Sequence, residues 1–210
     1  MNDKITVIDY GVGNLFSLRS SLHALGFAVQ LTGDPEELTK VSKIILPGVG
    51  AFGDAAQKLR STGLAEALVD QAKRGKPLLG ICLGMQLLFE KSFEFGECEG
   101  LGLVPGQVCS LEADLREAGL AYKVPHIGWN PLHLEKPTCP LFKNTREGDA
   151  FYFVHSYHAK NCGDSLAASC EYGLNVTAAV QADNVYGTQF HPEKSGKVGL
   201  SMLEAFGEVR

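Results

Sequence analysis

Two short segments of the chain carry residue types that can perform nucleophilic chemistry. Cys82 is bracketed by Gly80 and Gly84 at the end of an apolar run, and His191-Pro192-Glu193 ends a second run. Gly-x-Cys-x-Gly is the nucleophile-elbow pattern with sulfur in place of oxygen. A side chain projected from such a turn lies on strained backbone, and glycines let the strand and helix approach closely. We predict that Cys82 is a nucleophile; the alternative is a buried core cysteine.

A cysteine nucleophile needs a base, and the base needs a group that orients it. His191 follows residues 185–190, which we predict to be a strand, and Pro192 is expected to hold the backbone extended. In extended backbone, residues two apart point to the same side, so Glu193 can reach the imidazole of His191. The alternative is a solvated strand end with an incidental histidine and glutamate. Together the two segments predict a Cys82–His191–Glu193 triad.

The first half of the chain alternates between apolar runs and helical patterns. We predict strands over 4–9, 28–32, 43–46 and directly before Cys82, and helices over 15–25, from 35, over 54–60, over 64–73, and an amphipathic helix after Cys82. We also expect Asn14 and Asp34 to cap the helices that follow them. This alternation implies a parallel sheet with helices on both faces. It places the glycine loops 11–13 and 48–50 beside Cys82, at the carboxyl edge where α/β sheets bind ligands.

After residue 95 the pattern changes to short alternating runs rich in glycine and proline. We predict strands over 103–111, 124–134, 151–158, 166–172 and 176–182, and no helix until 197–209. The simplest architecture is one mainly parallel α/β sheet that antiparallel strands extend in the C-terminal half. No linker or repeat interrupts the pattern, so we expect a single domain over residues 1–210.

Composition excludes several classes of protein. The chain is 45% hydrophobic and 20% charged, which argues against disorder, and its net charge of −5 offers no footprint for nucleic acid. Residues 1–4 lead into an apolar run rather than a signal peptide, so we expect a cytoplasmic protein. The six cysteines form no CxxC pair, so we expect free thiols and no metal site. The glycines at 11 and 13 lack the third glycine of a dinucleotide fingerprint, and we expect no cofactor.

These motifs together resemble the class I glutamine amidotransferases, whose glutaminase domains carry a Cys-His-Glu triad in the same settings and have a flavodoxin-like fold. The resemblance runs nearly from end to end. Within that family, the chain most resembles the branch that supplies ammonia for histidine biosynthesis. The segments that carry it are 9–14, 47–54, 126–130, 153–157 and 189–195.

The resemblance implies a mechanism and a set of site residues. Cys82 would attack the side-chain amide carbon of glutamine, with His191 as base and then as acid to the departing ammonia. The family's oxyanion segment corresponds to residues 47–50, which implies that amides of Leu83 and of Val49 or Gly50 hold the oxyanion. The remaining implied substrate-binding residues are Gln86, Ser156, Tyr157 and, near the oxyanion loop, Asn14. Because glycines flank Val49, we hypothesise that this hole stays incomplete until a partner and its substrate bind.

Ammonia released into water would be protonated and lost as a nucleophile, and no second catalytic domain is visible in the chain. The acceptor is therefore expected on another chain. By resemblance the partner is a (βα)8-barrel cyclase that converts PRFAR to imidazole glycerol phosphate and AICAR. The positions expected at that interface and along the ammonia passage are Trp129, Asn130, Tyr152 and Lys194. A tryptophan in the core is the alternative for Trp129, although Gly128 and Asn130 suggest an exposed turn.

Three rival functions remain open from the sequence. A glutaminase subunit could serve pyridoxal phosphate, anthranilate or guanylate synthesis instead. A noncatalytic module could use the same fold with an inert cysteine. A hydrolase acting alone, such as a cysteine peptidase or a γ-glutamyl hydrolase, would need no partner.

Overall fold

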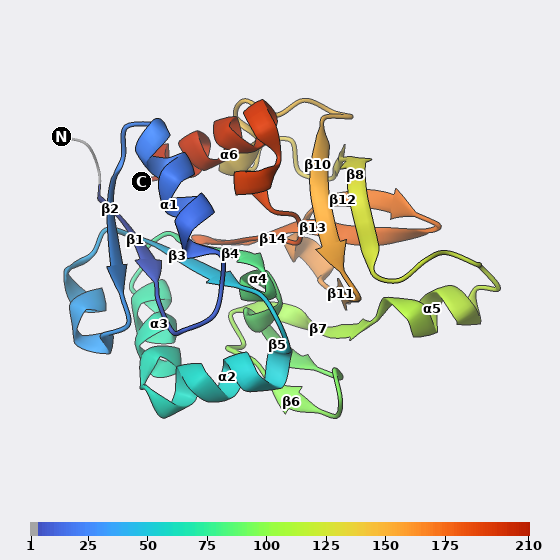
Figure 1. Cartoon of the computed structure of the whole chain (residues 1–210), viewed down its shortest axis with the longest axis horizontal. Helices are drawn as coiled ribbons and strands as arrows, with labels where there is room; N and C mark the ends of the chain where they lie inside the picture. Colours follow the sequence, from blue (N-terminus) through green and yellow to red (C-terminus); the bar gives the residue numbers. More distant parts are fainter. Residues whose placement is uncertain (1–3) are drawn as a thin grey trace.

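A mixed eight-stranded sheet forms the centre of the molecule (Figure 1). The structure, a computed structural model, describes residues 4–210. The prediction that residues 1–3 run directly into the first strand concerns positions outside this range. In sheet order the strands are β2 (Ala28–Thr32), β1 (Lys4–Ile8), β3 (Lys43–Gly48), β4 (Leu78–Cys82), β14 (Val185–Thr188), β13 (Leu174–Ala182), β12 (Leu166–Tyr172) and β9 (His133–Leu134). The first five are mutually parallel and the rest are antiparallel. The predicted α/β class and its antiparallel extension are confirmed.

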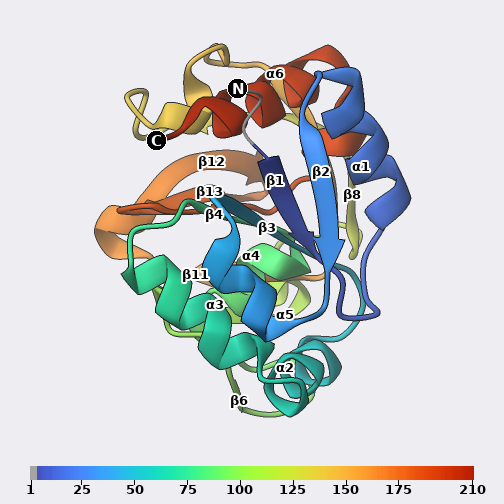
Figure 2. The ribbon, with the colours of Figure 1, turned by 90° about the vertical axis from the view of Figure 1, so that its left-hand side faces the viewer.

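Helices cover both faces of the parallel strands (Figure 2). The helices on one face are α1 (Leu15–Ala24) and α6 (Gly196–Glu208), and those on the other are α2 (Phe52–Ser61) and α3 (Leu64–Lys73). Along β3, Ile45 packs into the apolar cluster that includes α1 and α6, whereas Ile44 and Leu46 pack into the cluster on the opposite face. Because successive strand residues point to opposite faces, a strand covered on both sides is apolar throughout.

Two predicted caps begin their helices as expected. The side chain of Asn14 accepts a hydrogen bond from the backbone of Ser17 at the start of α1. Asp34 accepts from the backbone of Glu36 and begins η1 (Pro35–Lys40), which is a 3-10 helix rather than an α-helix. Each cap satisfies an amide that has no partner within the helix.

The prediction that all strands join one sheet is wrong. One smaller sheet pairs β8 (His126–Pro131) with β10 (Ala150–His155). Another contains β11 (Tyr157–Lys160), β7 (Val104–Ser110), β5 (Phe89–Ser92) and β6 (Cys98–Glu99). The predicted strand over 151–158 is divided at Ser156, where the chain passes from one small sheet into the other. Strand periodicity records which residues alternate and not which strands pair, so the sequence pattern is the same in both arrangements.

Two helices differ from the prediction. The helix after Cys82, α4 (Leu83–Leu87), is five residues long and buried throughout, so it is not amphipathic. It packs against β3, β4 and α2 and has no solvent face. Helix α5 (Leu111–Glu117) was not predicted. Its apolar pattern consists of only Leu111 and Leu115, too few to reveal a helical period, although Ser110 caps it. Across residues 4–210, no helix is long and apolar enough to span a membrane.

Candidate active site

Cys82 ends β4 on a strained turn. Its φ of 55° lies in the left-handed region, where a non-glycine residue costs about 1–3 kcal/mol. The flanking glycines are required by space: a Cβ on Gly84 would collide with the carbonyl oxygen of Leu46, and one on Gly80 would lie 2.6 Å from the Gly84 oxygen. The backbones of the strands and of helix α4 are therefore in direct contact here, and this close packing lets the thiol project from the end of β4.

The thiol lies in a cleft of about 340 Å³. This cleft brings together most of the side chains and amides that the sequence assigns to the site. The candidate oxyanion residues there are Val49, Gly50 and Leu83, and the candidate glutamine contacts are Gln86, Ser156 and Tyr157. Gly50 has a φ of 96° with open space around its Cα, and Val49 is exposed. The loop backbone is thus accessible to a substrate in the cleft.

His191 and Glu193 form a buried ion pair beside the thiol. Nδ1 of His191 lies 2.8 Å from Oε1 of Glu193, and the two side chains are 3% and 4% exposed. The predicted contact is present, but the expected extended backbone is not: residues Pro192–Lys194 form the 3-10 helix η4. A 3-10 turn starting at the proline carries Glu193 back toward the ring. The backbone amide of His191 is held by the Tyr152 carbonyl, which anchors the imidazole to β10.

The electrostatics of His191 suit a cationic imidazole. Burial works to lower the pKa of His191, but contacts with Cys82 and Glu193 raise it to about 9. Its other ring nitrogen, Nε2, is buried and bonds no nitrogen or oxygen of residues 4–210. With Nδ1 turned to the carboxylate, Nε2 is the nitrogen available to exchange a proton with sulfur or substrate.

Gln86 is buried at the floor of the cleft, and its amide nitrogen is already occupied. Nε2 donates to the Tyr157 carbonyl and to Oε1 of Gln189, both at 3.0 Å. An amide NH2 has two hydrogens, so only Oε1 of Gln86 remains to accept a hydrogen bond from a ligand. The resemblance implies that Gln86 binds glutamine, and this geometry limits that role to accepting a hydrogen bond through Oε1.

Two residues at the site were not predicted. Gln189, fully buried, donates from Nε2 to Sγ of Cys82 at 3.8 Å. It precedes His191 by two residues, and that spacing is the signal that could have identified it. The carboxylate of Glu94 lines the cleft and accepts a 2.6 Å hydrogen bond from the amide of Phe52, the first residue of α2. Glu94 lies in the turn after β5, and no sequence pattern marks it.

Asn14 lies outside the cleft. It lines a small adjacent cavity with Gly48 and Glu193. Its side-chain oxygen caps α1 and its nitrogen donates to the Ser17 hydroxyl at 2.9 Å. Asn14 is therefore close to the oxyanion loop, as expected, with a side chain that is bonded within the protein.

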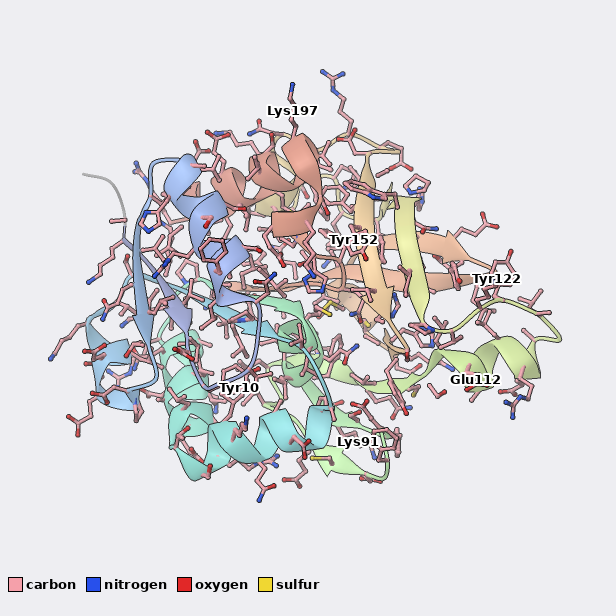
Figure 3. All side chains as sticks on the ribbon, viewed as in Figure 1. Tyr10, Lys91, Glu112, Tyr122, Tyr152 and Lys197 are labelled. Atoms are coloured by element: carbon pink, nitrogen blue, oxygen red, sulfur yellow. The ribbon has the colours of Figure 1, made fainter. Side chains whose placement is uncertain are left out.

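The residues expected at a partner interface lie on the small β8–β10 sheet and at the cleft rim. Trp129 is 55% exposed, so it is not a core residue, and it belongs to strand β8 rather than to a turn. It stands directly opposite Tyr152 of β10, with ring centroids 6.1 Å apart. Figure 3 labels Tyr152 on its strand. Asn130 follows on the same strand, and the exposed Lys194 lines the cleft.

A larger hollow of about 600 Å³ lies between α5, β11 and β13, away from Cys82. It contains Cys162 and His158, but their side chains are bonded to Thr177 and Asp114 rather than to each other. Between these two cavities, only the cleft joins a cysteine and a histidine that contact each other, Cys82 and His191. Residues 4–210 also contain no group of three side chains of the kinds that bind metal ions.

Comparison with known proteins matches residues 6–208 to the family model of glutamine amidotransferase class I. The chain belongs to the class I glutamine amidotransferase family. Similar family members include "Imidazole glycerol phosphate synthase subunit HisH" of Syntrophotalea carbinolica, 44% identical over 98% of this chain and 100% of the relative. The proteins of the same name from Geobacter sulfurreducens and Geobacillus thermodenitrificans are 45% and 50% identical. These matches cover 99% of this chain and 99% of the relative, and 96% and 94%.

Solved structures show the same family fold at lower sequence identity. The structure of PurLQS from Thermotoga maritima aligns with a TM-score of 0.77 at 22% identity, covering 98% of each chain. A glutamine amidotransferase from the same organism aligns with a TM-score of 0.69 at 14% identity, covering all of both chains. The predicted class I amidotransferase fold is thereby confirmed.

Proposed function

We propose that the chain is the glutaminase subunit of imidazole glycerol phosphate synthase. It hydrolyses glutamine to glutamate and ammonia and passes the ammonia to a cyclase subunit in histidine biosynthesis. The observation that carries this function is the 44–50% identity to synthase subunits over nearly the whole chain, in a fold that buries a cysteine beside a histidine–glutamate pair.

The geometry supports a thioester mechanism with Cys82, His191 and Glu193 as the triad. Nε2 of His191 first takes the proton of the Cys82 thiol; the thiolate Sγ then attacks the side-chain amide carbon, and a carbon–sulfur bond forms. Nε2 of His191 gives its proton to the amide nitrogen, the carbon–nitrogen bond breaks, and ammonia leaves. A water molecule then attacks the thioester and returns a proton to Nε2, the carbon–sulfur bond breaks, and glutamate leaves. Glu193 supports the imidazolium through Nδ1.

The oxyanion of each tetrahedral intermediate is assigned to the amide of Leu83 and to one from Val49 or Gly50. Such a donor contributes about 3–4 kcal/mol to transition-state stabilisation. The open space around Gly50 and the exposure of Val49 support the hypothesis that a bound partner completes this hole. A complete hole in the isolated chain, with an undiminished glutaminase rate, would contradict it.

Glutamine is bound as a zwitterion by groups in the cleft. Oε1 of Gln86 is the one atom of that side chain left to accept from the α-ammonium group, and the carboxylate of Glu94 provides an opposite charge. Ser156 and Tyr157 form the opposite wall, and their backbone is assigned to the α-carboxylate. Asn14 borders the same small cavity as Gly48 and Val49 of the oxyanion loop.

The partner is a (βα)8-barrel cyclase that converts PRFAR to imidazole glycerol phosphate and AICAR. Its docking face is assigned to the exposed ring of Trp129 on β8 and the half-buried ring of Tyr152 on β10, together with Asn130 and Lys194. Residues 1–210 act as a single glutaminase domain, without a cofactor and in the cytoplasm.

The decisive experiment measures glutamate release from glutamine by the purified chain, with and without the cyclase subunit and its nucleotide substrate. The proposal predicts stimulation of many-fold that Cys82→Ala abolishes. High activity of the chain alone would instead indicate an independent hydrolase. Activity with a different synthase partner would assign the chain to another branch of the family. Glutamine-dependent synthesis that persists in Cys82→Ala would indicate a noncatalytic module.

A further inference from the structure

A series of hydrogen bonds joins the strand β12 to the glutamine cleft through two buried histidines. Asn130 Nδ2 donates to the Glu171 carbonyl at 3.0 Å, and Asn130 Oδ1 lies 2.8 Å from Nε2 of His126. Nδ1 of His126 lies 3.0 Å from Nε2 of His155, and Nδ1 of His155 lies 2.9 Å from the Tyr157 carbonyl. His126 is fully buried and His155 is 6% exposed. Each contact is direct, at 2.8–3.0 Å, so its hydrogen must come from one of the two groups that meet there.

The two ends of the series determine how many protons it needs. A backbone carbonyl has no hydrogen, so the Tyr157 contact requires a proton on Nδ1 of His155. The Glu171 carbonyl likewise requires the amide nitrogen of Asn130, which leaves the acceptor Oδ1 facing His126. Nε2 of His126 must then carry a proton, and the contact between the two rings needs one more. Two neutral histidines hold only two ring protons, so this geometry is that of a pair with three protons and one positive charge.

The surroundings place the extra proton on His126. The rings of Phe153 and Tyr172 stack on it, with centroids 4.9 and 3.9 Å away, and aromatic faces attract cations. Burial and the charge of His126 lower the pKa of His155 to about 3, so His155 stays neutral with its proton on Nδ1. Burial also lowers the pKa of His126, while the bond to Asn130 raises it. Because burial is the larger effect, the pKa of His126 is lowered, so the third proton is bound at the acid end of the pH range and leaves as the pH rises.

The titratable groups around the pair come from several elements. His158 of β11 and His191, which precedes η4, both oppose a charge on His155. From β12, Glu171 presents its carbonyl while the residue itself is exposed. Among residues 4–210, no carboxylate is hydrogen-bonded to either ring of the pair. Asn130 is thus the group whose orientation decides whether the third proton is retained.

We propose that His126 and His155 are positioning residues that share three ring protons, and that the third proton couples Asn130, the strand neighbour of Trp129 in the assigned docking region, to the Tyr157 carbonyl in the cleft. This coupling rests on the proposed function for the identity of the two sites. When one proton leaves, His126 has a single ring proton for two contacts. If that proton stays on Nδ1 and joins the two rings, Nε2 of His126 and Oδ1 of Asn130 become two acceptors 2.8 Å apart, and Asn130 must turn away. A partner that holds Asn130 in place favours the proton, and the proton favours that partner by the same factor.

The effect reaches the substrate through the Tyr157 carbonyl, which accepts from both His155 and Gln86. A charged His126 polarises the His155 ring and strengthens its bond to that carbonyl, because hydrogen bonds in series reinforce one another. Gln86 in turn bonds Gln189, which donates to the sulfur of Cys82. The protonated pair therefore holds the wall that contacts glutamine.

Nitrogen-15 NMR of the full chain, labelled at histidine, tests the proton count directly. An imidazolium and the two neutral tautomers have distinct ring-nitrogen shifts. We expect His126 to carry protons on both nitrogens at the acid end of the folded range, and to titrate below His133, whose pKa Glu147 raises. His155 should stay neutral with its proton on Nδ1. The proposal is overturned if His126 is neutral wherever the chain is folded, or if the proton of His155 lies on Nε2 alone.

Two variants extend the test, and their nitrogen shifts can be measured without glutamine hydrolysis. Asn130→Asp places a carboxylate beside Nε2 and should move the His126 midpoint upward by about one to three pH units. His126→Gln should remove this titration and the matching step in the pH profile of KM for glutamine with the partner. His133→Gln, at an exposed histidine, should leave both unchanged. An unmoved midpoint in Asn130→Asp overturns the proposal, whereas an inactive chain with the expected nitrogen shifts would overturn only the proposed function.

Discussion

The side-chain nitrogen of Gln189 lies 3.8 Å from the sulfur of Cys82, in a site where both side chains are buried. Gln189 is itself held by Gln86, whose nitrogen donates to its oxygen at 3.0 Å. An amide hydrogen directed at sulfur stabilises a thiolate more than a thiol. The proposed nucleophile is thus supported by a neutral donor on the neighbouring strand end as well as by His191.

Replacing Gln189 with glutamate should slow glutaminase turnover about 10- to 100-fold. A hydrogen bond to a charged group contributes about 1.5–3 kcal/mol, and the new carboxylate would also repel a thiolate. Single-turnover kinetics of thioester formation measures the effect. Gln181→Glu, on β13 outside the cleft, is the matched control. Equal thioester rates in Gln189→Glu and the parent chain would show that the contact has no role in the reaction.

The glutaminase rate should fall at alkaline pH as His191 loses its proton near pH 9. Cys82 and Glu193 raise the pKa of His191 against the effect of burial, and the imidazolium is needed to protonate the leaving nitrogen. Glu193→Gln removes one of these contacts and should move the alkaline limb of kcat/KM to lower pH. The profile is measured with the partner present. An alkaline limb at the same pH in both proteins would remove His191 as its source.

The same pKa predicts how stability varies with pH. A histidine whose pKa is higher in the folded state stabilises that state fully below the unfolded pKa of about 6.5, and this contribution is lost as pH rises through about 9. The free energy of unfolding, measured in urea from about pH 6.5 to about pH 9.5, should therefore fall more in the parent chain than in His191→Gln. Parallel curves for the two proteins would contradict the raised pKa.

Gly84→Ala should be severely destabilising. The new methyl group would collide with the Leu46 carbonyl, and the backbone of α4 has no free space into which it could move. Gly53, in helix α2, has no neighbouring atom within 4 Å of the position that a methyl group would take, and its φ is not positive. Gly53→Ala should therefore stabilise the chain by about 0.5–1 kcal/mol. Thermal unfolding of both variants separates steric exclusion at the elbow from a general effect of glycine replacement.

Glu94→Gln should raise the KM for glutamine more than it lowers kcat. The amide oxygen can still accept from the backbone of Phe52, so helix α2 keeps its start, but the negative charge that faces the ammonium group is lost. Glu90→Gln is the control, because Glu90 also accepts a backbone hydrogen bond, from Gly106, without lining the cleft. A KM equal to that of the parent would exclude Glu94 from the glutamine site.

Local chemistry in the sequence determined the elements that carry the site and the residues of the predicted triad. A glycine-bracketed cysteine at a strand end, a histidine two residues from a glutamate, and side-chain caps such as Asn14 all depend on neighbours within a few positions. The same short-range signals correctly predicted the parallel strands and the helices that cover them. The family resemblance, carried by the same local motifs, made Gln86, Ser156 and Tyr157 candidates.

Tertiary structure alone decided which distant segments meet. Gln86 and Gln189 are 103 residues apart, and Glu94 meets Phe52 across 42 residues, so no local period can record either contact. The division of the C-terminal strands into separate sheets follows from pairing, which alternation leaves open. Nor does any sequence pattern place His126 against His155. The proton count of that pair follows from the direct contacts of the two rings with each other, with Asn130 and with the Tyr157 carbonyl, all of which the fold supplies.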